Sequence, residues 1–141
     1  MYMGPKEYMK VNVFGRIYIV IMSVYFVVSG FNALLDIDAK LARIGLAAND
    51  LDGKVAFILI YCSLMIGIGI AIALIAFMSK TWIYSAVLAT TIICSFILFR
   101  LIGSFMVGEM TNVQLSFILV EVIEASIGLL LLSKSKITRI C

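Results

Sequence analysis

Histidine is absent from this sequence, proline occurs once, at Pro5, and charged residues make up only 13% of the chain. The lack of histidine removes the commonest metal ligand and general base of proteins. The shortage of charge, together with 64% hydrophobic residues and a mean hydropathy of +1.18, excludes an ordinary soluble domain and is typical of an integral membrane protein. The net charge of +3 indicates no nucleic-acid partner, because the basic residues lie near the ends of apolar runs, where they set membrane topology.

Long apolar runs take up most of the chain. They cover residues 13–35, 55–78, 82–106 and 113–132. Each is about 20 to 25 residues long, enough to cross roughly 30 Å of hydrocarbon. A β-barrel would instead show segments of about 10 residues with alternating polarity. We therefore predict an all-α integral membrane protein, a single domain of residues 1–141 that forms an antiparallel bundle of four transmembrane helices.

The charges at the ends of these runs predict how the bundle lies in the membrane. The side that receives both termini and the Ser79-Lys80 turn carries one acid, Glu7, against many basic residues. These basic residues are Lys6, Lys10, Arg16, Lys80, Lys134, Lys136 and Arg139. The other side collects Asp36, Asp38, Asp50, Asp52 and Glu109 against Lys40, Arg43 and Lys54. Cytoplasmic loops are enriched in lysine and arginine, so both termini are expected to be cytoplasmic.

The first outer loop, "DIDAKLARIGLAANDLDGK" at residues 36–54, has apolar residues at helical spacing. They are Ile37, Leu41, Ile44, Ala48 and Leu51. This pattern predicts a short amphipathic helix across the mouth of the bundle, with Asp38 as its N-cap and Asn49 or Asp50 as the start signal of the second span. The alternative is a polar connecting loop with one turn of helix.

Three charged residues interrupt the apolar runs: Arg100 in the third, and Glu121 and Glu124 in the fourth. At 1.5 Å per residue, Glu121 lies roughly 12 Å, and Glu124 roughly 17 Å, below the outer start of the fourth helix. Arg100 lies roughly 9 to 12 Å below the outer end of the third helix. Arg100 and Glu121 should therefore face each other inside the bundle, where pairing lowers the cost of burying both charges. Glu124 is expected to be protonated or hydrogen-bonded to a hydroxyl.

Other polar residues are expected in the same outer half: Tyr61 in the second helix, and Asn32 and Tyr25 in the first. The candidate ligand-binding residues are Arg100, Glu121, Glu124, Tyr61, Asn32 and Tyr25. An ionisable residue inside a membrane indicates a functional site, and the sequence predicts an outer polar cleft centred on the Arg100–Glu121 pair. The alternative is that the pair is a structural clip between neighbouring helices.

No other motif indicates a catalytic centre. Cys62, Cys94 and Cys141 form no C-x-x-C pair and fall at different depths, which disfavours a catalytic disulfide. No metal site and no catalytic residue are predicted, because no nucleophile is paired with a base and the only close carboxylates lie beside an arginine. Whether the protein is an enzyme stays open, with a non-enzymatic role favoured. Small residues in "SLMIGIGIAIA" at 63–73 have the spacing that lets membrane helices approach closely.

Four segments carry a resemblance to a known family. They are "GRIY" at 15–18, "DGKVAFILIYCSLMIGIGIAI" at 52–72, "FRLIGSFMVGE" at 99–109 and "LVEVIEASIGLLLL" at 119–132. Their order resembles uncharacterised bacterial four-helix membrane proteins related to the DoxX-like group, over nearly the whole chain. The resemblance implies a compact four-helix bundle with Arg100 and Glu121 as the family's polar pair, and Cys62 stands where the family often has glycine. DoxX-like relatives are associated with quinone-linked oxidation and with assembly of other membrane proteins, but no reaction carries over.

Three functions follow as expectations. The first is binding of a lipid, quinone or other apolar ligand in the outer-leaflet cleft. The second is a structural or assembly (chaperone-like) subunit of a larger membrane complex, and the third is a proton-coupled small-molecule exporter. The expected partners are membrane lipid and either a membrane-protein partner or further copies of the chain. No cofactor is expected beyond a bound lipid or quinone. The expected location is the bacterial cytoplasmic (inner) membrane.

Overall fold

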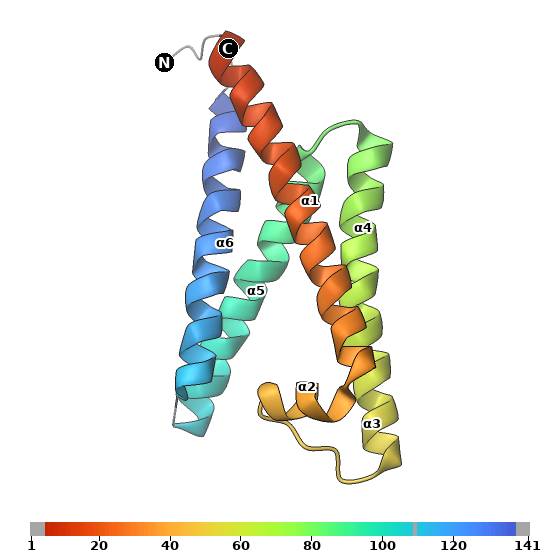
Figure 1. The fold of residues 1–141 in the computed structure, drawn as a ribbon. Coiled ribbons are helices and arrows are strands. Elements are labelled where there is room, and N and C mark those ends of the chain that lie inside the picture. Colours follow the sequence, from red (N-terminus) through yellow and green to blue (C-terminus); the bar gives the residue numbers. More distant parts are fainter. Residues whose placement is uncertain (1–4, 109, 138–141) are drawn as a thin grey trace. The chain divides into compact units, whose positions relative to one another are not determined.

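A computed structural model describes residues 5–108 and 110–137, and every regular element in these residues is helical (Figure 1). The elements are α1 (Pro5–Leu35), α2 (Ile37–Arg43), α3 (Leu51–Phe57), the π-helical segment η1 (Ile58–Cys62), α4 (Ser63–Ser79), α5 (Ile83–Val107) and α6 (Asn112–Ile137). Elements α3, η1 and α4 follow one another without a break. Glu109, Arg139 and Cys141, which entered the predictions above, lie outside the described residues.

Four helices are long and apolar enough to cross a membrane. They are Glu7–Leu35, Leu51–Ser79, Ile83–Val107 and Asn112–Ser135, with lengths of 29, 29, 25 and 24 residues. Many of their large apolar side chains are exposed, which would be costly in water and is normal against lipid. The four predicted spans are confirmed as helices, and this supports a membrane protein.

The helix ends differ from the apolar boundaries mainly at the N-terminus. The predicted first span began at residue 13, whereas α1 begins at Pro5. Hydropathy marks only the part of a helix that suits lipid, and a helix continues into polar sequence until something stops it. Proline is tolerated in the first turn, where its missing N–H has no helical partner in any case.

Two compact units make up the described chain, and each is treated by itself below. The first comprises the described parts of Met1–Ile19 and Ile75–Cys141, and the second comprises Val20–Leu74. Helices α1 and α4 contribute residues to both units.

In the first unit, α5 and α6 form a helical hairpin and pack along each other (Figure 1). Gly108 ends α5 with a left-handed φ of +82°, and its N–H donates to the Ser104 carbonyl at 3.0 Å. Glycine adopts this conformation without the penalty that a Cβ would bring. Thr111 then caps α6, because its hydroxyl accepts from the Gln114 N–H at 3.3 Å. The short turn makes the two helices antiparallel.

The start of α1 packs on the same unit through an aromatic contact. Trp82, only 3% exposed, donates from Nε1 to Asn12 Oδ1 at 2.8 Å. A Cβ on Gly15 would overlap the indole ring, so the glycine is what lets α1 approach Trp82. The hydroxyls of Tyr18 and Thr90 lie 3.2 Å apart. These polar contacts fix how the N-terminal half of α1 packs on Trp82 and α5.

In the second unit, α1 and α4 approach closely at Gly69. A Cβ there would lie 2.7 Å from the Ser23 carbonyl oxygen, and the Ser23 hydroxyl donates to the Gly69 carbonyl at 2.8 Å. Gly67, by contrast, faces open space. The face of α4 that carries Gly69 therefore serves helix packing in this unit, whereas the face that carries Gly67 does not.

The loop after α1 contains the short helix α2. Its Leu41 is buried against Ala33, Phe57 and Cys62. The prediction that Asp38 caps this helix is wrong: Asp36 is the N-cap and accepts from the Ala39 N–H at 2.9 Å. Asp38 lies in the first turn of α2, two residues after the N-cap, and pairs instead with Lys54 at 2.7 Å.

The predicted start signal of the second span is present. Asp50 caps α3 and accepts from the Gly53 N–H at 2.7 Å. An aspartate at this position satisfies one of the N–H groups that the first helical turn leaves without a partner.

Candidate functional site

The predicted contact between Arg100 and Glu121 is present in the first unit. Arg100 lies seven residues before the end of α5 and Glu121 nine residues after the start of α6, so the antiparallel hairpin brings them to one level. Arg100 Nη2 is 2.6 Å from Glu121 Oε1, and Arg100 Nε is 3.2 Å from Glu121 Oε2. The two parallel bonds are the bidentate arrangement that holds a guanidinium and a carboxylate most firmly.

Two further residues of α6 complete the surroundings of Arg100. Gln114 Oε1 accepts from Arg100 Nη1 at 2.5 Å, and the guanidinium carbon lies 5.0 Å from the centre of the Phe117 ring. Neither residue was predicted from the sequence. Their spacing was the available signal, because Gln114, Phe117 and Glu121 follow the i, i+3, i+7 pattern of one helix face. A glutamine on the face of a buried glutamate is a natural second acceptor.

The arginine keeps some capacity to bind another group. A guanidinium has five N–H donors, and Glu121 and Gln114 account for three of them. Two N–H groups, one on each Nη, have no acceptor among the residues that the structure describes. The Arg100 side chain is 24% exposed, whereas that of Glu121 is 9% exposed. The accessible part of the pair is therefore its donor side.

Glu124 lies one turn further along α6 and has a different environment. Its Oε2 is buried without a hydrogen-bond partner among the described residues. The nearby Tyr18 hydroxyl donates to the Glu124 backbone carbonyl at 3.4 Å rather than to this carboxyl group, and the predicted alternative, a protonated Glu124, stays a prediction. Glu124 thus takes no part in the contacts that surround Arg100.

The remaining candidate residues belong to the second unit. Tyr61 is half-buried; its ring stacks on Phe57 with centres 5.0 Å apart, and its hydroxyl lies 3.5 Å from that of Ser29. Lys40 of α2 donates to the Ser29 hydroxyl at 3.5 Å and lies 5.2 Å from the centre of the Tyr61 ring. Lys40 and Ser29 were not predicted from the sequence, because their contacts depend on where α2 lies in the folded chain.

Tyr25 and Asn32 both lie on α1 with exposed side chains. Tyr25 is 42% exposed and contacts Phe26 edge to face, with ring centres 5.5 Å apart. Asn32 is exposed on α1. Within the second unit the structure groups Tyr61 with Ser29 and Lys40, and the inclusion of Tyr25 and Asn32 in the site stays a prediction.

The described residues include no arrangement of side chains that would support a metal site or a catalytic disulfide. Within residues 5–108 and 110–137, no three cysteine, aspartate or glutamate side chains gather in a way that could hold a metal ion. Cys62 is a buried free thiol and Cys94 an exposed one.

Comparison with known proteins adds no assignment to this geometry. No family model matches the chain, and no curated protein or solved structure is significantly similar to it. The resemblance to the DoxX-like group stays a prediction.

Proposed function

We propose that the protein is a four-span antiparallel helical bundle of the membrane, with cytoplasmic termini, that binds the polar end of a lipid or quinone at Arg100. The observation that carries this proposal is the state of the guanidinium. Glu121, Gln114 and Phe117 fix its position, and yet its side chain is 24% exposed with two N–H donors left over among the described contacts. A donor held in place in this way costs little to order when a ligand arrives.

The net charge of the Arg100–Glu121 pair indicates which polar groups of a lipid or quinone the site can bind. Glu121 neutralises Arg100, so the site attracts a multiply charged anion only weakly. A carbonyl oxygen or a singly charged phosphodiester fits better, because either accepts the free N–H groups without demanding a full countercharge. Ester carbonyls of lipids and the carbonyls of quinones belong to this class. The short helix α2 is proposed to be amphipathic and to cover the outer mouth of the bundle.

The test is the content of bound apolar molecules. Wild-type protein and the Arg100→Ala and Arg43→Ala variants would be purified in the same mild detergent, and their organic extracts quantified by mass spectrometry per mole of protein. Arg43 is a suitable control because it is an exposed arginine of α2. We expect a retained lipid or quinone in the wild type and in Arg43→Ala, and several-fold less in Arg100→Ala.

A second variant separates loss of the ligand from loss of the fold. Replacing Arg100 and Glu121 together by leucine removes both charges, and such replacements of buried pairs are often neutral for stability. A double variant that folds and still retains as much ligand as the wild type would refute the binding site. Equal ligand content in all variants would do the same.

The second candidate is a structural or assembly subunit in which the pair only clips α5 to α6. The nearly complete burial of Glu121 and its two bonds to Arg100 favour it. Exchanging the two residues (Arg100→Glu with Glu121→Arg) should then preserve thermal stability and the capture of a membrane-protein partner from mild-detergent extracts. A protein that elutes only alone or as a homo-oligomer would exclude the partner.

A further inference from the structure

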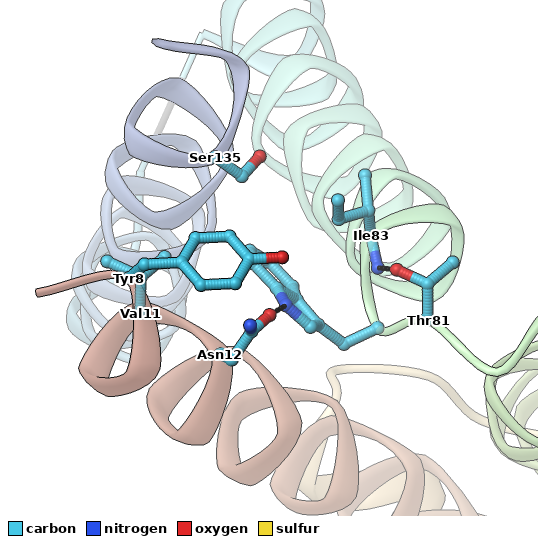
Figure 2. A pocket seen from close by; sticks show the side chains of 7 residues that line it. Tyr8, Val11, Asn12, Thr81, Ile83 and Ser135 are labelled. Atoms are coloured by element: carbon cyan, nitrogen blue, oxygen red, sulfur yellow. Dashed lines mark hydrogen bonds between the residues drawn. The ribbon is translucent and has the colours of Figure 1, made fainter. Parts of the chain in front are cut away.

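A pocket of about 240 Å³ lies in the first unit, away from Arg100. Its lining comes from the start of α1, the turn before α5 and the end of α6, and consists of Tyr8, Val11, Asn12, Thr81, Trp82, Ile83 and Ser135. Figure 2 shows Tyr8 reaching across the pocket, with Ser135 on one side and Thr81 and Ile83 on another. At about 30 Å³ per water molecule, the volume suits a small polar group rather than a drug-sized ligand.

Hydrogen-bond donors dominate the polar part of this lining. Trp82 Nε1–H donates to Asn12 Oδ1, which fixes the orientation of the amide and leaves its two N–H donors for the pocket. The Thr81 hydroxyl oxygen accepts from the Ile83 N–H at 3.4 Å, so its own hydrogen is free to donate. The Tyr8 hydroxyl adds a third donor group on a side chain that is 49% exposed. No carboxylate lines the pocket. The lining therefore suits an acceptor-rich group.

The position of the pocket and the charges around it indicate which chemical class of ligand it could bind. Tyr8, Ile83 and Ser135 lie at or next to the ends of three candidate spans, the level at which lipid headgroups meet water. An exposed lysine directly precedes a lining residue at three places: Lys10, Lys80 and Lys134. One acidic residue, Glu7, also directly precedes a lining residue. Basic residues at this level attract anionic headgroups. Val11 and Ile83 supply apolar surface beside the donors.

We propose that this pocket binds the phosphodiester group of an anionic phospholipid from the leaflet at the chain termini. The Asn12 amide, with the hydroxyls of Thr81 and Tyr8, donates to the non-bridging phosphate oxygens, and the lysines supply the surrounding positive field. The Arg100 pair takes no part, so this site and the function proposed for Arg100 stand or fall separately.

The experiment is native mass spectrometry of the detergent-solubilised full chain, titrated with phosphatidylglycerol or with phosphatidylcholine of the same acyl chains. Inorganic phosphate forms a third arm, which distinguishes a lipid from a free anion. Asn12→Asp is the main variant, because a carboxylate still accepts from Trp82 but removes the amide donors and repels phosphate. Asn112→Asp is its matched control: the same change at an exposed residue at the other end of α6, about 35 Å from Ser135.

We expect phosphatidylglycerol to bind wild type and Asn112→Asp about tenfold more tightly than Asn12→Asp, as the loss of charge-assisted bonds implies. Tyr8→Phe, which removes one exposed hydroxyl and leaves the fold intact, should weaken binding by a smaller factor, with Tyr84→Phe as its control. Equal binding of the two lipids would overturn the proposal, as would equal binding by Asn12→Asp and Asn112→Asp. Inorganic phosphate that binds with the same dependence on Asn12 and displaces the lipid would overturn the lipid assignment.

Discussion

Replacing Glu121 alone with leucine should destabilise the protein far more than replacing Glu121 and Arg100 together. The single change leaves a guanidinium that is only 24% exposed beside an apolar side chain. The value for surface pairs, about 0.2 to 1 kcal/mol, does not apply, because solvent reaches little of either group. Breaking a buried pair by removing one partner costs about 3 to 5 kcal/mol.

The lower end of that range is expected here. Arg100 keeps its bond to Gln114, and it lies about 10 Å from the end of α5, so its side chain can extend part of the way toward water. We therefore expect a loss of about 3 kcal/mol for Glu121→Leu and a similar loss for Arg100→Leu. The double change leaves only the Gln114 amide without its partner, which costs about 1 kcal/mol.

The assay is a double-mutant cycle, with the free energy of unfolding measured by titrating dodecyl sulfate into mixed micelles. Helicity and the fluorescence of the single tryptophan, Trp82, are independent probes. The loss in the double variant, about 1 kcal/mol, should therefore be about 5 kcal/mol smaller than the sum of the two single losses. Single losses below about 1 kcal/mol that simply add would show that the pair is a screened contact, and the reasoning would be wrong.

Three further predictions use the same measurement. Gly69→Ala should destabilise the protein, because the new Cβ would lie 2.7 Å from the Ser23 carbonyl oxygen. Gly67→Ala in the same helix should leave the free energy of unfolding unchanged or raise it by up to about 1 kcal/mol, and equal effects of the two changes would contradict the close approach at Gly69. Gln114→Leu should cost about 1.5 to 3 kcal/mol through the lost bond to Arg100, and a loss that persists unchanged in the Arg100→Leu background would assign it to another cause. Lys54→Ala should cost less than about 1 kcal/mol and respond to salt, because the side chains of Lys54 and Asp38 are 36% and 71% exposed; a larger, salt-independent loss would contradict this.

Secondary structure was largely predictable because it depends on neighbours in the sequence. Each apolar run became a helix, and the turns between helices fall where polar residues and glycines cluster. Asp50, one of the two start signals predicted for the second span, is a cap. The prediction for Asp38 was wrong because Asp36 and Asp38 carry the same chemistry, and only the path of the chain after Leu35 selects between them. The extension of α1 back to Pro5 was missed because hydropathy does not report on helix formed in polar sequence.

One contact of the site was predictable from depth. Antiparallel helices joined by a short turn place residues at equal distances from that turn side by side, and this was enough to pair Arg100 with Glu121. The same reasoning placed Tyr61, Asn32 and Tyr25 in one outer half of the bundle but did not predict the direction in which each side chain points. Depth is one coordinate, and the rotation of each helix about its axis is a second that the sequence left open.

By itself, then, the sequence determined that this chain has four helices suited to lipid and that the third and fourth carry opposite charges at one level. Only the tertiary structure decided that Gln114 and Phe117 surround the guanidinium, that Lys40 folds over Tyr61, and that Tyr8, Asn12, Thr81 and Ser135 line one pocket. The physical reason is that these helices are apolar on every side, so no polar face reveals which side of a helix meets its neighbour. Close packing at residues such as Gly15 and Gly69 selects that side and therefore decides which residues each polar group contacts.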